Sequence, residues 1–188
     1  MKNILITGVP GIGKTTVIKH IVEKLITVEG ANIHGFFTEE IRNDQKQRMG
    51  FDIVMIKENR RIQLADKRGV LPQEGTKYLG QYIVYVKNFE QMVLPLLHSV
   101  SNAILVIDEI GKMELFSSQF EQAVKSLVHR KDIFVIATVP VKGPPIISHL
   151  KEDQNCQVFW VNEKTRDTLP DKLINIVKQI NNPNKLPK

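Results

Sequence analysis

The stretch best equipped for chemistry is a glycine-rich loop near the N-terminus. Residues 8–15 read Gly8-Val9-Pro10-Gly11-Ile12-Gly13-Lys14-Thr15, which matches the pattern G-x-x-x-x-G-K-[ST] at every defined position. In this pattern backbone N–H groups surround phosphate oxygens, the lysine neutralises the β- and γ-phosphates, and the hydroxyl coordinates Mg²⁺. We predict that Gly8 to Thr15 bind a triphosphate, that Lys14 also serves catalysis, that Thr15 binds Mg²⁺, and that Thr16 lies near the α-phosphate.

A second motif places two carboxylates after an apolar run. Residues 103–107 are Ala-Ile-Leu-Val-Ile, and Asp108 and Glu109 follow directly. In open α/β sheets, ligands bind at the carboxyl ends of the strands. We therefore expect Asp108 to bind Mg²⁺ at the nucleotide and Glu109 to polarise an attacking water. The alternative is that Glu109 has only a structural role and caps the next element. Because a water nucleophile needs a group that orients it, the Asp-Glu pair favours hydrolysis over transfer to an acceptor.

The same residues also raise the possibility of a GTPase switch. Residues 108–111 fit D-x-x-G, the γ-phosphate-sensing motif of that class. The guanine-reading pattern N/T-K-x-D is not found in the sequence: Asn184-Lys185 is followed by Leu186-Pro187, and Thr165-Arg166-Asp167 has arginine where lysine belongs. Guanine-specific switching is therefore not favoured.

The elements that must position these residues alternate between strand and helix. Periodicity and turn residues predict strands at about 3–7, 34–39, 50–56, 60–65, 82–86, 103–107, 133–139 and 157–161. They predict helices at 14–28, at 89–97 with a kink or early end at Pro95, at 116–129, and from Thr168 onward, with a loop at 140–145. The alternation predicts an α/β fold with a mostly parallel sheet, helices on both faces, and an antiparallel hairpin addition at about 42–68. We expect one domain over residues 1–180 and a flexible tail at 181–188.

Composition excludes several classes of protein. The chain has 188 residues with 42% hydrophobic and 24% charged side chains, as in ordinary globular domains. Its apolar runs are far shorter than the ~20 residues that span a bilayer, and the N-terminus lacks the pattern of a signal peptide. A single cysteine, Cys156, has no internal disulfide partner. These features predict a reducing, cytoplasmic location and no membrane partner.

The positive charge is concentrated in one segment. The formal charge is +6, and residues 42–68 carry eight basic residues against four acidic ones. Such a run usually faces water, although it can also lie over a polyphosphate or nucleic acid. Aromatic residues make up only 6% of the chain and do not alternate with these basic residues, so nucleic acid is not the expected partner.

Four segments together resemble a known family. They are the phosphate loop, VIDEIGKMELFS (residues 106–117), GFFTEEIR (35–42) and RMGFDI (48–53). The chain resembles, over about residues 1–180, the small nucleoside-triphosphatases first described from thermophiles, whose vertebrate members are called cancer-related nucleoside triphosphatase. The resemblance implies a RecA-like P-loop NTPase fold in which one strand separates the phosphate-loop strand from the Asp108 strand. It also implies Mg²⁺-dependent hydrolysis of ATP, GTP, CTP and UTP to the diphosphate and phosphate, with broad base specificity.

One position departs from the family pattern. The family often has Asn-Arg-Asp near its C-terminal loop, whereas this chain has Thr165-Arg166-Asp167. The resemblance thus implies a nucleotide contact for Arg166 and puts a contact through the asparagine in doubt. Arg42, Arg48 and Arg166 are candidates for a cis arginine that stabilises the transferring phosphoryl group, and Thr138 is a candidate γ-phosphate sensor.

Two rival functions remain open at this stage. A nucleotide or small-molecule kinase would use residues 42–68 as a lid over an acceptor. A nucleotide-gated switch would bind RNA or protein through the same basic segment. Hydrolysis of nucleoside triphosphates is the leading prediction.

Overall fold

The described residues form a single mixed sheet with helices on both faces. The computed structural model describes residues 2–28, 31–67 and 75–181. The strands are β1 (Asn3–Gly8), β2 (Ile33–Arg42), β3 (Arg48–Met55), β4 (Arg61–Asp66), β5 (Thr76–Leu79), β6 (Tyr82–Tyr85), β7 (Ala103–Asp108), β8 (Ile133–Pro140) and β9 (Cys156–Trp160). The helices are α1 (Lys14–Ile26), α2 (Val86–Ser99), α3 (Ser118–Leu127), α4 (Pro145–Glu152) and α5 (Leu169–Asn181), with a 3₁₀ turn, η1, at Glu114–Phe116.

The sheet has a parallel half and an antiparallel half. Its strand order is β5-β6-β4-β3-β2-β7-β8-β1-β9. The pairs β2–β7, β7–β8, β8–β1 and β1–β9 are parallel, whereas β2–β3, β3–β4, β4–β6 and β6–β5 are antiparallel. One strand, β8, lies between β1 and β7, as the family resemblance implied. The carboxyl ends of β1, β7, β8 and β2 therefore meet at one edge.

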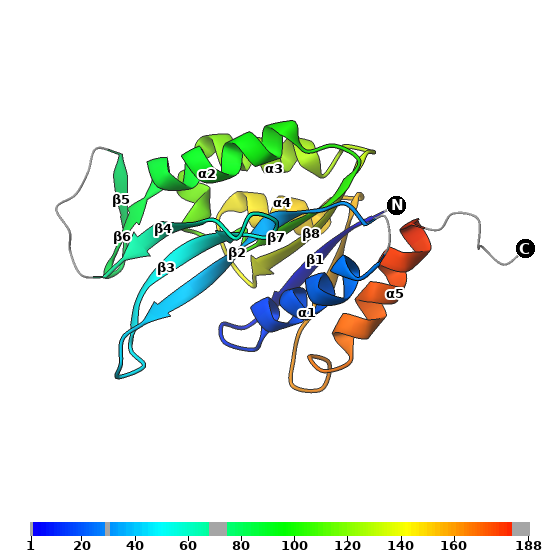
Figure 1. Cartoon of the computed structure of the whole chain (residues 1–188), viewed down its shortest axis with the longest axis horizontal. Helices are drawn as coiled ribbons and strands as arrows, with labels where there is room; N and C mark the ends of the chain where they lie inside the picture. Colours follow the sequence, from blue (N-terminus) through cyan, green and yellow to red (C-terminus); the bar gives the residue numbers. More distant parts are fainter. Residues whose placement is uncertain (1, 29–30, 68–74, 182–188) are drawn as a thin grey trace, which may run out of the picture.

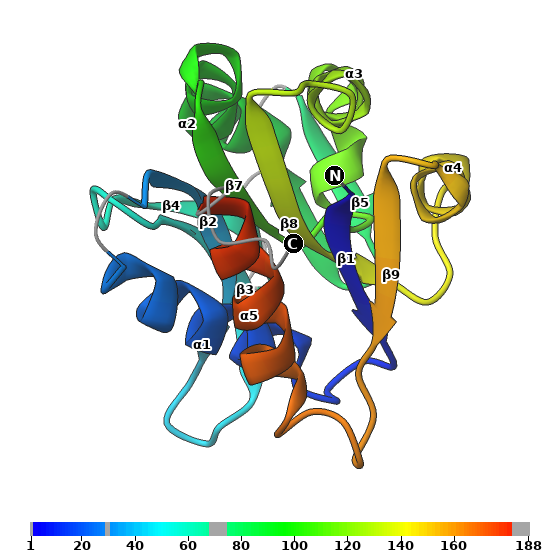
Figure 2. The ribbon, with the colours of Figure 1, turned by 90° about the vertical axis from the view of Figure 1, so that its right-hand side faces the viewer.

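Each face of the sheet has its own apolar core. Helices α1 and α5 cover one face, and α2, α3 and α4 cover the other (Figures 1 and 2). On the second face Phe36, Phe89 and Phe120 are fully buried and pack edge to face or tilted, with centroids 4.9–6.3 Å apart. Because strands such as β7 are buried on both sides, they read as continuous apolar runs rather than as alternating ones.

The antiparallel half is larger than the predicted hairpin. Strands β3 and β4 pair as predicted, but β6 and β5 extend the sheet further (Figure 1). The sequence pattern did not predict β5, because TKYL is short and three of its four residues carry polar groups. Arg68, at the end of the predicted addition, lies outside the described residues.

Two helices also differ from expectation. Helix α2 runs through Pro95 from Val86 to Ser99, since burial of Phe89, Val93 and Leu97 outweighs the cost of the proline. Helix α4 follows the predicted loop and was not foreseen. Helix α3 lies within the predicted range of 116–129 and begins at Ser118, with Ser117 as its N-cap. Helix α1 ends at Ile26, two residues before the predicted end at Val28, and Asn181, the first residue of the predicted tail, belongs to α5; residues 182–188 lie outside the described residues.

Two further predictions from the sequence concern membrane-spanning helices and the single cysteine. In the part of the chain that the structure describes, no helix has both the length and the apolar character needed to cross a membrane. Cys156 is buried, and burial raises the pKa of its thiol to about 11. The thiol is therefore protonated at neutral pH and chemically quiet.

Candidate active site

The phosphate loop connects the end of β1 to the start of α1. Gly13 is the N-cap of α1 with φ 108°, and Gly11 has φ 77°. These left-handed conformations strain any residue with a Cβ, so glycine is required at both positions. The loop therefore presents its N–H groups at the positive end of a 13-residue helix, which is an anion-binding arrangement.

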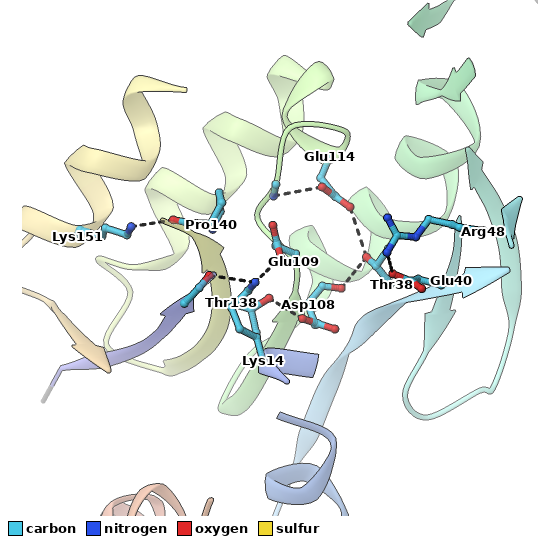
Figure 3. Close-up of polar contacts among 12 residues, drawn as sticks. Lys14, Thr38, Glu40, Arg48, Asp108, Glu109, Glu114, Thr138, Pro140 and Lys151 are labelled. Atoms are coloured by element: carbon cyan, nitrogen blue, oxygen red, sulfur yellow. Dashed lines mark hydrogen bonds and ion pairs between the residues drawn. The ribbon is translucent and has the colours of Figure 1, made fainter. Parts of the chain in front are cut away.

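Lys14 lies back over this loop. Its Nζ is 3.4 Å from the carbonyl oxygen of Gly8 and 3.7 Å from Oε2 of Glu109, and its side chain is only 10% exposed. The ammonium group is thus held between the loop and the carboxylate at the end of β7. Figure 3 shows Lys14 beside both Glu109 and Asp108.

Asp108 is buried at the carboxyl end of β7. The neighbouring strand β8 brings Thr138 into contact, and the Thr138 hydroxyl donates a hydrogen bond of 2.5 Å to Asp108 Oδ1. Burial raises the pKa of Asp108 to about 6, against the opposing effect of hydrogen bonds from Thr138 and Thr15. Its second oxygen, Oδ2, is buried without a hydrogen-bond partner among the described residues.

This unpaired oxygen makes the site suitable for Mg²⁺. A buried carboxylate oxygen next to the Thr15 hydroxyl offers the hard oxygen donors that Mg²⁺ prefers. Within the described ranges, no group of three or more His, Cys, Asp or Glu side chains could hold a metal. Mg²⁺ at a nucleotide needs only one or two protein ligands because phosphates and waters supply the others. The donor set therefore fits Mg²⁺ bound together with a nucleotide.

Glu109 faces the cleft and does not cap a helix. The next element, η1, has Met113 as its N-cap with no side-chain hydrogen bond. The Glu109 side chain is 32% exposed and approaches Lys14. The capping alternative is therefore not supported, and Glu109 is accessible to a ligand at the phosphate loop.

Glu114 is a component of the site to which the sequence assigned no role. The residue is 4% exposed, although it begins the 3₁₀ turn η1. Its Oε2 accepts a 3.2 Å hydrogen bond from the Gly111 N–H, and its Oε1 is 3.4 Å from the Thr38 hydroxyl. Burial, with smaller contributions from the charges of Glu109 and Asp108, raises the pKa of Glu114 to about 8. The only signal in the sequence was an acid between Met113 and Leu115.

These groups line a single cleft of about 1040 Å³. The cleft begins at Pro140 and Lys142, crosses the phosphate loop and the carboxylates, and ends at Phe51 and Leu79 of the antiparallel half. Of the predicted site residues, the structure brings Gly8, Pro10, Gly11, Gly13, Lys14, Thr15, Thr16, Asp108 and Glu109 together along its wall. The side chain of Val9 is 56% exposed, and Ile12 packs toward the core beneath α1 and α5.

The three candidate arginines occupy different places. Arg48 lines the cleft and forms an ion pair with Glu40, as Figure 3 shows. Arg42 pairs with the same Glu40 and with the carbonyl oxygen of Lys46, away from the cleft wall. Arg166 is exposed and 3.8 Å from Asp167, and it does not line the described cleft.

The fold and the loop together define a class of protein. A parallel α/β core, a glycine-rich loop from β1 into α1, and an acidic pair on the next strand but one are features of P-loop nucleotide-binding proteins. The family model described as NTPase matches residues 3–174, so the chain belongs to that nucleoside-triphosphatase family.

Relatives with curated names cover almost the whole chain. The chain is 34% identical to the mouse cancer-related nucleoside-triphosphatase homolog, with 94% of this chain and 97% of that protein aligned. It is 32% identical to nucleoside-triphosphatase THEP1 of Aquifex aeolicus, with 94% and 99% aligned.

Solved structures agree with this assignment. The crystal structure of THEP1 from A. aeolicus superposes with a TM-score of 0.80 at 32% identity, covering 95% of this chain and 99% of that one. The solution structure of a human cancer-related nucleoside triphosphatase also gives 0.80, at 35% identity, covering 95% and 98%.

Proposed function

We propose that this protein hydrolyses nucleoside 5'-triphosphates to the diphosphate and phosphate in a Mg²⁺-dependent reaction with broad base specificity. The observation that carries the proposal is the convergence of Lys14, Asp108 and Glu109 on one phosphate-binding loop. The names of the relatives, nucleoside-triphosphatases, support the same activity.

The phosphate loop binds the substrate. The backbone N–H groups of residues 8–15, of which Pro10 has none, surround the β- and γ-phosphates, and Lys14 neutralises their charge. Thr15 and Asp108 would hold Mg²⁺, which supplies additional neutralisation of the triphosphate when it is bound. Thr16 lies toward the α-phosphate, and Arg166 remains a predicted contact of the nucleoside.

Glu109 is the group that orients and deprotonates the attacking water. The water oxygen forms a bond to the γ-phosphorus, the bond from that phosphorus to the bridging oxygen breaks, and the water proton passes to Glu109. Before substrate arrives, Lys14 is 3.7 Å from Glu109. When the Lys14 ammonium group pairs with the phosphates instead, the Glu109 carboxylate is free to bind the water.

The remaining parts of the cleft have secondary roles. Thr138 positions Asp108 through its hydrogen bond, which is a more specific role than sensing the γ-phosphate. Arg48 is the arginine on the cleft wall and is our candidate for stabilising charge on the γ-phosphoryl group. The cytoplasmic location stays a prediction from the sequence.

The test is phosphate release from ATP, GTP, CTP and UTP, with Mg²⁺ or with excess EDTA. We expect Mg²⁺-dependent release from all four, with kcat lowered about 10²- to 10⁴-fold in Glu109→Gln while nucleotide binding persists. The matched control is Glu121→Gln, because Glu121 is a partly exposed acid on α3 that pairs with Lys125. Release that persists unchanged in Glu109→Gln would refute the role of Glu109. Diphosphate formation that requires an added acceptor would instead identify a kinase.

A further inference from the structure

Glu114 connects three separate parts of the active site. Its carboxylate contacts the Gly111 N–H in the loop after β7 and the Thr38 hydroxyl on β2. We propose that Glu114 is a positioning residue: it fixes the loop at residues 109–113 against β2 and thereby holds Glu109 at the angle that water attack requires. The inference rests on the proposed function, since it deepens the role given there to Glu109.

The first support is a bridge through Thr38. The Thr38 hydroxyl donates a 2.7 Å hydrogen bond to the carbonyl oxygen of Asp108, the residue before Glu109. The same hydroxyl oxygen lies 3.4 Å from Oε1 of Glu114, so one side chain contacts both the end of β7 and η1. Figure 3 shows Thr38 between Glu114 and Asp108. The bridge thus ties β2, the end of β7 and η1 together.

The second support is the close approach of two carboxylates around Gly111. A Cβ built on Gly111 would lie 2.9 Å from Oε2 of Glu114 and 3.0 Å from Oε1 of Glu109. Both carboxylates therefore pack directly against the face of residue 111 that a side chain would occupy. The φ of Gly111 is not in the left-handed region, so the backbone itself would accept alanine. An alanine at this position would therefore displace the ends of these two side chains rather than strain the backbone.

A direct catalytic role for Glu114 fits the geometry less well. Although Glu114 borders the cleft, it is 4% exposed, and each oxygen already has a protein partner. The Glu109 side chain, by comparison, is 32% exposed, and among the described residues its ion pair is with Lys14 at 3.7 Å. Burial also raises the pKa of Glu114 to about 8, so it is protonated at neutral pH and is a poor base for water.

The experiment measures kcat and nucleotide dissociation constants for four variants. Glu114→Ala removes both contacts, Glu114→Gln keeps an acceptor for Gly111 and a donor for Thr38, Thr38→Val removes the bridge, and Gly111→Ala adds the obstructing methyl group. We expect kcat to fall about 10- to 100-fold in the alanine and valine variants, with nucleotide affinity within about threefold of wild type. Glu114→Gln should recover most of the kcat that Glu114→Ala loses, and Thr38→Ser should do the same for Thr38→Val.

A double-mutant cycle with Glu109→Gln distinguishes a positioning role of Glu114 from a general disturbance of the active-site structure. If Glu114 acts through Glu109, then adding Glu114→Ala to Glu109→Gln lowers kcat by less than about twofold, because the group being positioned is already gone. Additive losses in the cycle, or equal losses in kcat and in nucleotide affinity, would overturn the proposal. So would full activity in Gly111→Ala and Thr38→Val, which are informative even if Glu114→Ala fails to fold.

The same data distinguish a failure of the proposed hydrolase activity from a failure of the positioning role of Glu114. Absence of phosphate release from the wild-type protein contradicts the proposed hydrolase. Release by wild type that is unaffected by the Glu114, Thr38 and Gly111 substitutions contradicts only the positioning role. The control is Glu121→Ala, which removes an acid of α3 outside the site and should leave kcat unchanged.

Discussion

Replacement of Glu114 by glutamine should stabilise the protein, and the gain should increase with pH. In the folded chain, burial raises the pKa of Glu114 from 4.5 to about 8. Between these two values the unfolded chain has lost the proton and the folded chain keeps it. The folded state therefore binds more protons, and its stability falls as pH rises across this window. Glutamine has the shape and the hydrogen bonds of the protonated acid but does not titrate, so Glu114→Gln removes this dependence.

The size of the effect follows from the two pKa values. Each pH unit within the window changes the free energy of unfolding by about 1.4 kcal/mol for one proton. Between pH 5 and pH 8 the advantage of Glu114→Gln should grow by about 3 kcal/mol, an upper limit because local opening can hydrate the ionised carboxylate. For a chain of this length that corresponds to a difference in Tm of about 6 to 12 °C.

The assay is urea unfolding of wild type and Glu114→Gln at pH 5, 6, 7 and 8, followed by circular dichroism. Other carboxylates titrate in both proteins, so the difference between the two curves isolates Glu114. A difference that stays constant over this range would refute the idea that Glu114 is protonated in the folded chain. A variant less stable than wild type at pH 8 would do so as well. Glu121→Gln, tested in parallel, is the control, because Glu121 is a partly exposed acid on α3.

Two predictions concern the scaffold around the site. Phe120→Ala should lower the free energy of unfolding by about 3 to 5 kcal/mol in urea titrations, because Phe120 is fully buried between Phe36 and Phe89 and leaves a large cavity; a loss below about 1 kcal/mol would contradict the packing. Ser117→Ala should cost about 1 to 2 kcal/mol, since the Ser117 hydroxyl accepts the Phe120 N–H at 3.0 Å and donates to Glu90 at 2.6 Å. An unchanged Tm would show that α3 does not depend on this cap.

The phosphate loop and the parallel core could be predicted from sequence because their signals are local. Gly11, Gly13 and Lys14 have fixed spacing, and that spacing alone determines a left-handed turn into a helix. The run at 103–107 is apolar throughout because β7 is buried on both faces. The carboxylates at its end then have to lie at the same sheet edge as the loop. A pattern of this kind needs no knowledge of distant contacts.

The antiparallel half could not be predicted with the same success. Strand β5 is four residues long and pairs with β6 across the two-residue turn Gly80-Gln81, a short hairpin signal that the largely polar sequence of β5 obscured. Helix α2 continues through Pro95 because its apolar face is buried against the sheet. In α2, tertiary packing thus overrides the local preference of proline. The position of Arg48 on the cleft wall depends on this half of the sheet, so the sequence could not distinguish it from Arg42.

Glu114 could not be predicted for a related reason, and its placement explains how three acids share one site. Asp108, Glu109 and Glu114 lie within seven residues, and within the described part of the chain Lys14 is the cation that the structure places next to Asp108 and Glu109. Three ionised carboxylates so close together would repel one another strongly in a partly buried cleft. Burial keeps Glu114 neutral, against the opposing effect of the hydrogen bond that it accepts from the Gly111 N–H, so Glu114 adds no negative charge near Lys14. The neutral acid thus holds the loop in place without adding to the repulsion that an incoming triphosphate must already overcome.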